Sequence, residues 1–450
     1  MKKLHIKTYG CQMNVYDSER IVEVLAPLGF ALTDHADDAD MVILNTCHIR
    51  EKAAEKVYSE LGRLRKMKEA KAEVGGQMIL GVTGCVAQAE GGEVTKRAPF
   101  VDMVFGPQTY HRLPEMIART AREHGHILDT DFPEESKFDA LPTARTVEGA
   151  AAFLVVQEGC DKFCTYCVVP YTRGAEYSRS ASEVMAEAKI LVEAGAREIT
   201  LLGQNVNAYH GAADDGTEWN LARLIREVAT IEGLERIRYT TSYPAEVDDD
   251  LIQAHGEVEK LMPYLHLPIQ SGSDPVLKAM NRQHNVEDYK KVVAKLRAAR
   301  PDLALSGDFI VGFPGETDED FEATMQFIKD VTFIQAYSFK YSPRPGTPAA
   351  LMENQIPEAI KAERLARLQA LINEQVLAFN VASVGKTYAV LFDRIGKEPG
   401  QLVGRSPYTQ AVVIEGDESL LHTIQDVLIT SAGKTSLKGT LVGAAKRACA

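Results

Sequence analysis

Two long stretches of the sequence alternate between strand-like and helix-like segments, and this alternation restricts the possible fold more than any other feature. In residues 1–125 the apolar runs KLHIKTYG, DMVILN, QMILGVTG and DMVFG are each followed by a helical pattern. A second series of the same kind covers residues 151–345. Strands that alternate with helices at this spacing pair in parallel, with the helices as crossovers. The chain is therefore predicted to be an α/β protein.

The second series holds six strand-and-helix units. Its predicted strands are AFLVVQEG, EITLLGQ, RIRYTTSYP, YLHLPIQS, LALSGDFIVGF and IQAYSFKYS. Six units fit a partial or open barrel, because a closed barrel of this type has eight. The polar stretches CDKFCTYC, GQN, TSYP, QSGSD and GFPGET follow the first five strands. Ligand sites in such folds lie at the carboxyl ends of the strands, so we expect these stretches to form the site.

The remaining segments differ in composition from both series. Residues 127–150 are polar and contain two prolines, which is typical of a linker. A helix is predicted over 357–378, and the last stretch consists of short β-prone segments separated by Gly, Asp and Ser, which predicts a small β-barrel. The predicted domains are 1–126, 151–380 and 381–450.

Charge and cysteine usage restrict the partners and the compartment. The net charge is −13, which argues against nonspecific coating of nucleic acid but leaves room for a local basic patch. The N-terminus lacks the apolar core of a signal peptide, and no apolar run approaches about 18 residues, so a cytoplasmic chain without a membrane span is expected. In a reduced compartment an odd number of cysteines, here seven, favours metal binding or catalysis over disulfides.

Three of these cysteines follow the first three predicted strands. Cys11, Cys47 and Cys85 each lie directly after a strand, at the edge where open α/β sheets bind ligands. The alternative is that each is a small buried core residue, as free cysteines often are. Three matching positions in successive units favour a common site.

Three more cysteines lie within the eight residues CDKFCTYC. Cys160, Cys164 and Cys167 have the spacing C-x3-C-x2-C, and a closed tetrahedral metal site normally needs a fourth ligand. Three thiolates alone fit a 4Fe–4S cluster whose fourth iron is left for a small molecule. Zinc with a distant His or Cys as the fourth ligand is the less favoured alternative, since the next cysteine is Cys449.

The motif C-x3-C-x-aromatic-C, with Tyr166 as the aromatic residue, resembles the radical S-adenosylmethionine superfamily. Further stretches make nearly the whole chain similar to the methylthiotransferases of that superfamily: TYGCQMN, NTCHIREKA, GVTGCVAQ, GCDKFCTYCVVPYTRGAEYSR, LLGQNVNAY, HLPIQSGSDPVLKAMNRQH, DFIVGFPGET and YSPRPGTPA. The resemblance implies a Rossmann- or flavodoxin-like N-terminal domain, a partial (β/α)6 radical barrel and a C-terminal TRAM domain, which is an RNA-binding module.

The same resemblance implies two 4Fe–4S clusters with different tasks. Cys160, Cys164 and Cys167 would hold the cluster whose open iron binds S-adenosylmethionine and whose electron releases a 5′-deoxyadenosyl radical. Cys11, Cys47 and Cys85 would hold an auxiliary cluster that carries sulfur, to which a second S-adenosylmethionine donates a methyl group. The radical would remove hydrogen from an unactivated carbon, which then receives the methylthio group.

Short signatures around the first two cysteines, CQMN and NTCHIRE, resemble the branch of the family that acts on tRNA. That branch modifies C2 of N6-isopentenyladenosine beside the anticodon. The alternatives are action on threonylcarbamoyladenosine in tRNA, action on a ribosomal protein side chain, or a noncatalytic iron–sulfur protein that binds RNA. The implied partners are the tRNA anticodon arm and a reductant protein such as flavodoxin or ferredoxin, and the chain is expected to be a monomer.

Contacts to S-adenosylmethionine are expected after the barrel strands. Arginine can pair with its carboxylate, and glycine-rich turns allow close approach of the backbone. The alternatives are a salt-bridged loop for RGAEYSR and a helix cap for QSGSD. The Gly-Gly-Glu signature of many radical enzymes is absent after the second strand, where GQN stands. The residues predicted to contact the cofactor are Tyr166, Arg173, Glu176, Arg179, Gln204, Ser271, Gly312 and Glu316.

Contacts to RNA are expected in the C-terminal barrel, where Arg405 and Tyr408 place a cation beside an aromatic ring. The basic run GRLRKMKEAK at 62–71 is interpreted instead as a solvated helix, because its charges point all round. His48 stands where the family more often has a small residue, and Cys449 is predicted to bind no metal.

Overall fold

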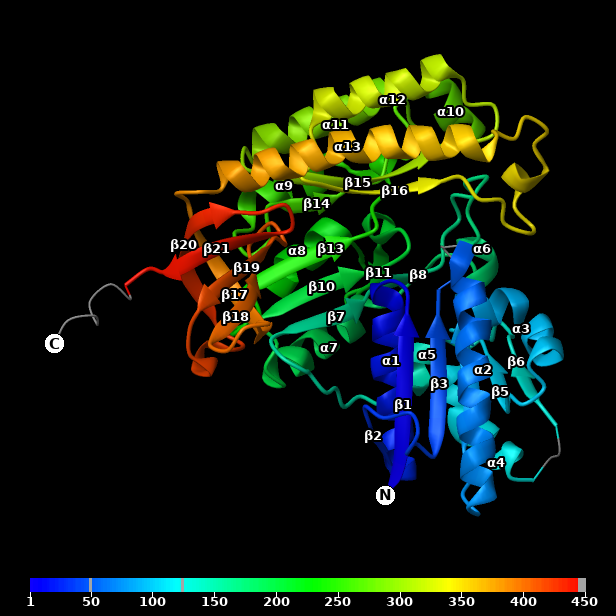
Figure 1. Cartoon of the computed structure of the whole chain (residues 1–450). Coiled ribbons are helices and arrows are strands. Elements are labelled where there is room, and N and C mark those ends of the chain that lie inside the picture. Colours follow the sequence, from blue (N-terminus) through cyan, green and yellow to red (C-terminus); the bar gives the residue numbers. More distant parts are fainter. Residues whose placement is uncertain (48–50, 123–124, 444–450) are drawn as a thin grey trace. The chain divides into compact units, whose positions relative to one another are not determined.

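The computed structural model describes residues 1–47, 51–122 and 125–443 (Figure 1). It divides into two compact units. The first comprises Met1–Thr146, Glu158–Asp161 and Val168–Tyr177; the second comprises Val147–Gln157, Lys162–Cys167 and Ser178–Ala450. His48 and Cys449 lie outside the described residues.

The first unit is built on a six-stranded parallel sheet with the order β2-β1-β3-β4-β5-β6. The strands are β1 (Lys2–Tyr9), β2 (Phe30–Leu32), β3 (Met41–Thr46), β4 (Ile79–Gly84), β5 (Met103–Phe105) and β6 (Ile127–Asp129). The order 2-1-3-4-5 is that of flavodoxin, and its strand order reverses between β1 and β3. The flavodoxin-like prediction is therefore confirmed.

Helices cover both faces of this sheet because the side chains of a strand alternate between faces. Val42 and Leu44 of β3 pack in one core with α2 (Glu51–Glu73) and α3 (Cys85–Arg97). Met41 and Ile43 pack in the opposite core with α1 (Gln12–Leu25) and α4 (Leu113–Thr120). Figure 1 shows α1 and α2 flanking β1 and β3.

The segment predicted to be a linker contributes to the first unit. It supplies β6 and α5 (Lys137–Ala140), together with loops. The unit also contains η1 (Ala26–Leu28), η2 (Tyr110–Arg112) and α6 (Val169–Thr172). Strands β8 (Gln157–Glu158) and β9 (Tyr177–Ser178) form a separate two-stranded sheet.

The second unit contains the predicted six parallel strands. They form the sheets β13-β10-β7 and β14-β15-β16, which a parallel bridge between Ile237 and Leu261 connects. The strands are β7 (Ala151–Val155), β10 (Glu198–Leu202), β13 (Arg236–Thr240), β14 (Tyr264–His266), β15 (Ala304–Val311) and β16 (Gln335–Lys340). The partial six-stranded barrel is thereby confirmed.

Helices follow the strands as the pattern predicts. They are α7 (Ala181–Glu193), α8 (Leu221–Ala229), α9 (Asp249–Glu257), α10 (Asp274–Ala279), α11 (Val286–Ala299), α12 (Asp318–Val331) and α13 (Glu358–Ala382). Side-chain N-caps start several of them, among them Asp248 for α9 and Thr317 for α12. Short 3-10 turns and a small hairpin complete the connections: η3 (Val206–Ala208), β11 (His210–Ala212), β12 (Glu218–Asn220), η4 (Pro244–Glu246) and η5 (Pro348–Leu351).

The chain ends in a closed five-stranded barrel of order β17-β18-β19-β21-β20. Its elements are β17 (Thr387–Ile395), β18 (Gln401–Arg405), β19 (Ala411–Glu415), η6 (Glu418–Leu420), β20 (Ile424–Ala432) and β21 (Ser436–Leu441). Arg238 of β13 donates to the carbonyls of Pro407 (2.8 Å) and Ser406 (3.1 Å), which joins this barrel to the strand sheet within the second unit. In the described part of the chain, no helix has the length and apolar character that a membrane span requires.

Candidate functional site

Cys11, Cys47 and Cys85 lie at the carboxyl ends of three adjacent parallel strands. Cys11 follows β1 and precedes α1, Cys47 follows β3, and Cys85 is the first residue of α3 after β4. The central position belongs to Cys47, whose thiol lies within hydrogen-bonding reach of both other cysteines. The predicted convergence at one sheet edge therefore occurs, although β2 intervenes in sequence between the first two strands.

The three thiols influence one another's ionisation. A hydrogen bond from Cys47, together with the nearby positive charge of Arg173, lowers the pKa of Cys11 to about 7 and that of Cys85 to about 6. The same hydrogen bonds raise the pKa of Cys47. Low thiol pKa values favour the thiolate, which is the form that binds metal.

Glycines allow the turns that carry Cys11 and Cys85. Gly10 has a φ of +143°, and a Cβ there would lie 2.5 Å from both Asn14 Oδ1 and Cys47 Cβ. Gly84 has a φ of +91°, and a Cβ there would lie 2.3 Å from the carbonyl oxygen of Thr46. Both glycines permit a backbone conformation and a close approach that a side chain would prevent.

Two buried asparagines orient the same turns. Cys11 caps α1, and both its backbone amide and its thiol donate to Asn14 Oδ1 over 3.4 Å. Asn45, two residues before Cys47, donates to the carbonyl of Asn14 (2.8 Å) and to Ser18 Oγ (2.9 Å). The asparagines of the motifs CQMN and NTC thus join the turn after β1 to the end of β3.

The donor set fits an iron–sulfur cluster better than a single metal ion. Among the described residues, no three His, Cys, Asp or Glu side chains form a group that could hold one metal ion. A 4Fe–4S cluster makes a different demand, because each thiolate binds a separate iron. Three cysteines at one edge, Cys11 exposed, Cys85 partly buried and Cys47 buried, lie beside a cationic side chain and meet that demand.

The loop CDKFCTYC divides between the two units. Cys160 belongs to the first unit, where its amide donates to the carbonyl of Gly174 over 3.3 Å. Cys164 and Cys167 belong to the second, where the Cys167 amide donates to the Cys164 carbonyl over 2.9 Å. Thr165 between them is fixed by bonds to the backbone of Met280 (3.1 Å) and Ala279 (2.9 Å).

Arg282 is a candidate site residue that the sequence reasoning missed. Its Nη1 lies 3.6 Å from Cys164 Sγ, its Nη2 donates to the carbonyl of Pro268 (2.6 Å), and its guanidinium stacks on Tyr243 at 4.3 Å. The charge of Arg282 opposes the burial that raises the pKa of Tyr166. Arg282 lies in the stretch AMNRQH, but the sequence alone does not show that the fold places this stretch beside the cysteine loop.

Tyr166 lies against an apolar cluster in the same unit. The cluster consists of Val276, Met280, Phe313, Tyr341 and Ala349, which come from α10, the GFPGET turn and the YSPRPGTPA segment. The aromatic residue of the motif therefore positions the loop by packing. Its role beside S-adenosylmethionine stays a prediction.

Several residues predicted to contact the cofactor have partners inside the protein. Arg179 donates to Glu187 (2.7 Å) and to the carbonyl of Val155 (2.8 Å). Arg173 is buried among ion pairs of the first unit, next to Cys85. Both arginines form ion pairs, as expected for the salt-bridged loop considered above, and their contact with S-adenosylmethionine stays a prediction.

Glu316 and Ser271 are likewise used within the second unit. Glu316 accepts from Arg364 Nη1 (2.6 Å) and from the amide of Gly312 (2.8 Å), and burial raises its pKa. The Ser271 hydroxyl is fully buried and lies 3.2 Å from Thr324 Oγ1. These side chains shape the turns around Gly312 and QSGSD, and their direct contact with S-adenosylmethionine stays a prediction.

Gln204 and Glu176 are partly exposed and stay candidates. The GQN turn is held by Gln157, whose Oε1 accepts from the amides of Gln204 (2.9 Å) and Asn205 (3.0 Å). The amide of Glu176 donates to Asp161 Oδ1 over 3.2 Å. Gln157 is another residue that the sequence reasoning missed, because its role depends on the pairing of β7 with β10.

The two residues predicted to bind RNA have different environments. Arg405 is 46% exposed and forms an ion pair with Asp393 over 3.2 Å, so its guanidinium stays available at the surface. Tyr408 packs edge-on against Phe379 and Tyr388, and its hydroxyl donates to Asp302 (3.2 Å). Tyr408 therefore fixes the barrel to its neighbours, and its contact with RNA stays a prediction.

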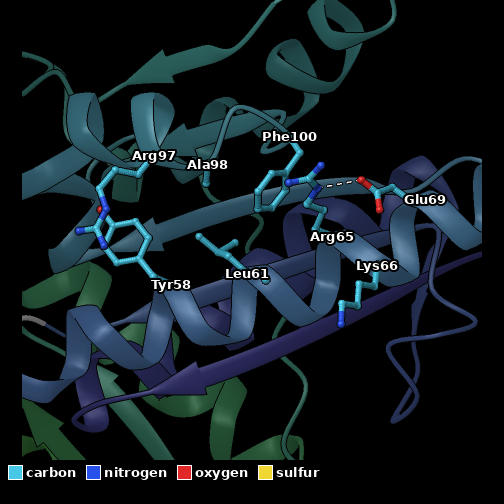
Figure 2. A pocket seen from close by; sticks show the side chains of 9 residues that line it. Tyr58, Leu61, Arg65, Lys66, Glu69, Arg97, Ala98 and Phe100 are labelled. Carbon is cyan, nitrogen blue, oxygen red and sulfur yellow. Dashed lines mark hydrogen bonds and ion pairs between the residues drawn. The ribbon is translucent and has the colours of Figure 1, made fainter.

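The basic run on α2 lines a surface pocket of about 400 Å³ (Figure 2). Figure 2 shows Arg97 over the ring of Tyr58, at 3.6 Å, and Arg65 beside Phe100. Arg65 also pairs with Glu69 (2.7 Å), and both side chains are more than half exposed. This exposed ion pair favours the interpretation of α2 as a solvated helix.

Comparisons with known proteins agree with this organisation. Residues 3–106 match an uncharacterized protein family, residues 154–328 the radical SAM superfamily, and residues 381–442 the TRAM domain. A tRNA-2-methylthio-N(6)-dimethylallyladenosine synthase from Maricaulis maris is 58% identical over 99% of this chain and 99% of its own length.

Solved structures resemble the fold at low sequence identity. The radical S-adenosylmethionine methyltransferase TsrM from Kitasatospora setae has a TM-score of 0.56 at 14% identity, covering 78% of this chain and 74% of its own. The cobalamin-dependent radical enzyme OxsB has a TM-score of 0.53 at 13% identity, covering 83% of this chain and 56% of its own. Both likenesses concern the fold alone.

Proposed function

This chain belongs to the family of the tRNA-2-methylthio-N(6)-dimethylallyladenosine synthases, and from that premise we propose that it attaches a methylthio group to C2 of N6-isopentenyladenosine beside the anticodon of tRNA. It is an enzyme of the radical SAM superfamily with a TRAM domain. The observation that carries the proposal is the pair of three-cysteine sets, one at the edge of the flavodoxin-like sheet and one in CDKFCTYC after β7.

Membership of the superfamily implies one 4Fe–4S cluster and S-adenosylmethionine, and we assign that cluster to Cys160, Cys164 and Cys167. The second cluster, held by Cys11, Cys47 and Cys85, is part of our proposal and is supported by their shared sheet edge and by the lowered thiol pKa values of Cys11 and Cys85. When bound, these groups supply the one-electron cleavage of S-adenosylmethionine and the sulfur that is transferred.

The chain's own residues orient these groups. Arg282 places a positive charge 3.6 Å from Cys164, and Tyr166 holds the cysteine loop against the apolar cluster. Gln204, Glu176 and the backbone at Gly312 are the proposed contacts to S-adenosylmethionine. Gln204 and Gly312 follow the barrel strands β10 and β15, where such folds bind their ligands, and Glu176 lies between α6 and β9. The side chains of Gln204 and Glu176 are partly exposed.

We assign tRNA recognition to the C-terminal barrel and Arg405 in particular, because a partly exposed guanidinium suits contact with phosphate or a base. The proposed division of the chain is 1–126 for the auxiliary cluster, 151–380 for radical chemistry and 381–450 for RNA. We further propose a monomer in the cytoplasm, reduced by a protein such as flavodoxin or ferredoxin.

Mass spectrometry of tRNA nucleosides tests this function. A strain that lacks the chain should lose 2-methylthio-N6-isopentenyladenosine and accumulate the unmethylthiolated precursor. The wild-type gene should restore the product, whereas Cys164→Ala and Cys47→Ala should each fail to do so.

Two results would direct the assignment elsewhere. Loss of methylthiolated threonylcarbamoyladenosine instead would place the enzyme in the other tRNA branch. Unchanged nucleosides, together with a mass change on a ribosomal protein, would transfer the activity to a protein side chain.

A further inference from the structure

Four charged side chains form a buried ring in the first unit. Asp17 pairs with Arg173 (2.6 Å), Arg173 with Glu158 (3.0 Å), Glu158 with Lys137 (2.7 Å), and Lys137 approaches Asp17 again at 3.7 Å. None of the four side chains is more than 4% exposed. We call these residues the charge ring.

Burying the charge ring costs free energy. Two carboxylates and two cations lose hydration, and an apolar replacement of such a group is often neutral or stabilising. Gln108 adds hydrogen bonds to Glu158 Oε2 (3.1 Å) and to the carbonyl of Arg173 (3.0 Å), so the positions are fixed in detail. Because these side chains are held so firmly at this cost, a functional role is expected for one member of the ring.

The ring joins segments that adjoin the cysteines of this unit. Asp17 lies on α1, whose N-cap is Cys11, and Glu158 stands two residues before Cys160. Arg173 caps the C-terminus of α6 and is the member that faces the sheet-edge thiols. It lies within hydrogen-bonding reach of Cys85, and its charge also acts on Cys11.

We propose that Arg173 is a positioning residue of the site formed by Cys11, Cys47 and Cys85. Asp17 and Glu158 hold its guanidinium against the thiolates, where it balances their negative charge and that of the cluster they would hold. The inference rests on the proposed function, because it assumes that these cysteines hold a cluster.

A fixed positive charge favours the more negative, reduced state of a cluster, so it raises the reduction potential. Removing Arg173 should therefore shift the potential of the auxiliary cluster to a more negative value. Neutralising Asp17 should shift the potential in the opposite direction, because the guanidinium remains while a nearby negative charge is lost.

The test uses the full-length chain with Cys160, Cys164 and Cys167 changed to alanine, so that one cluster remains. The midpoint potential is measured by an EPR-monitored redox titration, and iron is counted after anaerobic reconstitution. We expect a negative shift or a loss of iron for Arg173→Met, a smaller negative shift for Arg173→Lys, and a positive shift for Asp17→Asn.

Arg20→Met is the matched control. It removes another buried, ion-paired arginine from the same unit, one that contacts Glu23 and Pro142. It should keep the parent potential and iron content. Parent values for both Arg173→Met and Asp17→Asn would overturn the inference; if Arg173→Met does not fold, Arg173→Lys and Asp17→Asn decide.

The outcome is separable from the enzymatic proposal. The potential is measured without tRNA and without the radical cluster, so a shift in Arg173 variants stands even if the tRNA nucleosides prove unchanged. Conversely, a parent potential in these variants would overturn the role of Arg173 without affecting the proposed methylthiolation of tRNA.

Discussion

The side-chain amide of Asn14 donates to Oδ1 of Asn45 over 2.9 Å, and both residues are fully buried. This bond joins the turn that carries Cys11 to the strand that leads into Cys47. The spacing of two cysteines that are far apart in the sequence therefore depends on a pair of asparagines, each in a cysteine motif.

Asn45→Ala should destabilise the protein by about 1–3 kcal/mol, because it leaves buried polar partners unsatisfied on Asn14 and Ser18. Urea unfolding measures this loss, and iron per chain should fall at the auxiliary site alone. Asn373→Ala on the exposed side of α13 is the control and should change neither quantity. Full iron binding in Asn45→Ala would show that the asparagine pair does not position the cysteines.

Gly10→Ala should abolish the auxiliary cluster, because the new Cβ would collide with both Asn14 and Cys47. Gly29→Ala separates collision from backbone strain. Gly29 also has a positive φ, +80°, but a Cβ added there would meet nothing within 4 Å, so this change should cost only about 1–2 kcal/mol. Thermal unfolding and iron analysis of both variants test this, and equal iron loss in both would refute the packing argument.

Arg405→Ala should weaken tRNA binding and reduce the slope of log K against log salt by about 1, as expected when one phosphate contact is lost. Binding isotherms at several salt concentrations give the slope. Arg367→Ala, which removes a similarly exposed and ion-paired arginine from α13, should leave the slope as it is. Equal effects of the two changes would remove Arg405 from the RNA contact.

Stability should fall in mild acid because of His255. Burial, with a smaller contribution from Arg300, lowers the pKa of His255 to about 3, well below its ordinary value near 6.5. The unfolded chain therefore binds a proton that the folded chain does not, and stability is lost as the pH falls from about 6.5 towards 3. At pH 5 the loss is about 2 kcal/mol relative to pH 7.5.

Urea unfolding of the metal-free protein at both pH values measures this effect. His255→Gln should lose about that much of the pH dependence, whereas His35→Gln, at an exposed position, should keep it. An unaltered pH dependence in His255→Gln would contradict the assignment.

Periodicity and motif spacing predicted the parallel sheets because apolar strands and amphipathic helices alternate plainly in both series. They missed β2, whose three residues are too few to show a pattern, and they did not show that α1 begins at Gln12. The helix starts there because Cys11 caps it together with Asn14. The sequence does not reveal this start because cysteine is not an ordinary N-cap residue.

The convergence of Cys11, Cys47 and Cys85 was predictable because each follows a strand, and the carboxyl ends of parallel strands meet at one edge of the sheet. Side chains whose partners are distant in sequence were not. Arg282 reaches Cys164 across 118 positions, and Arg173 pairs with Asp17 across 156. The sequence also did not show that the ring of Tyr408 packs against Phe379 and Tyr388.

Counting iron and acid-labile sulfide in the anaerobically reconstituted chain tests the central claim, that one chain holds two clusters through three cysteines each. We predict about eight irons for the wild type and for Cys449→Ala, and about four for either Cys164→Ala or Cys47→Ala. Cys164→Ala should also stop cleavage of S-adenosylmethionine, which Cys47→Ala should retain. About four irons in the wild type, with no loss in Cys47→Ala, would contradict the account.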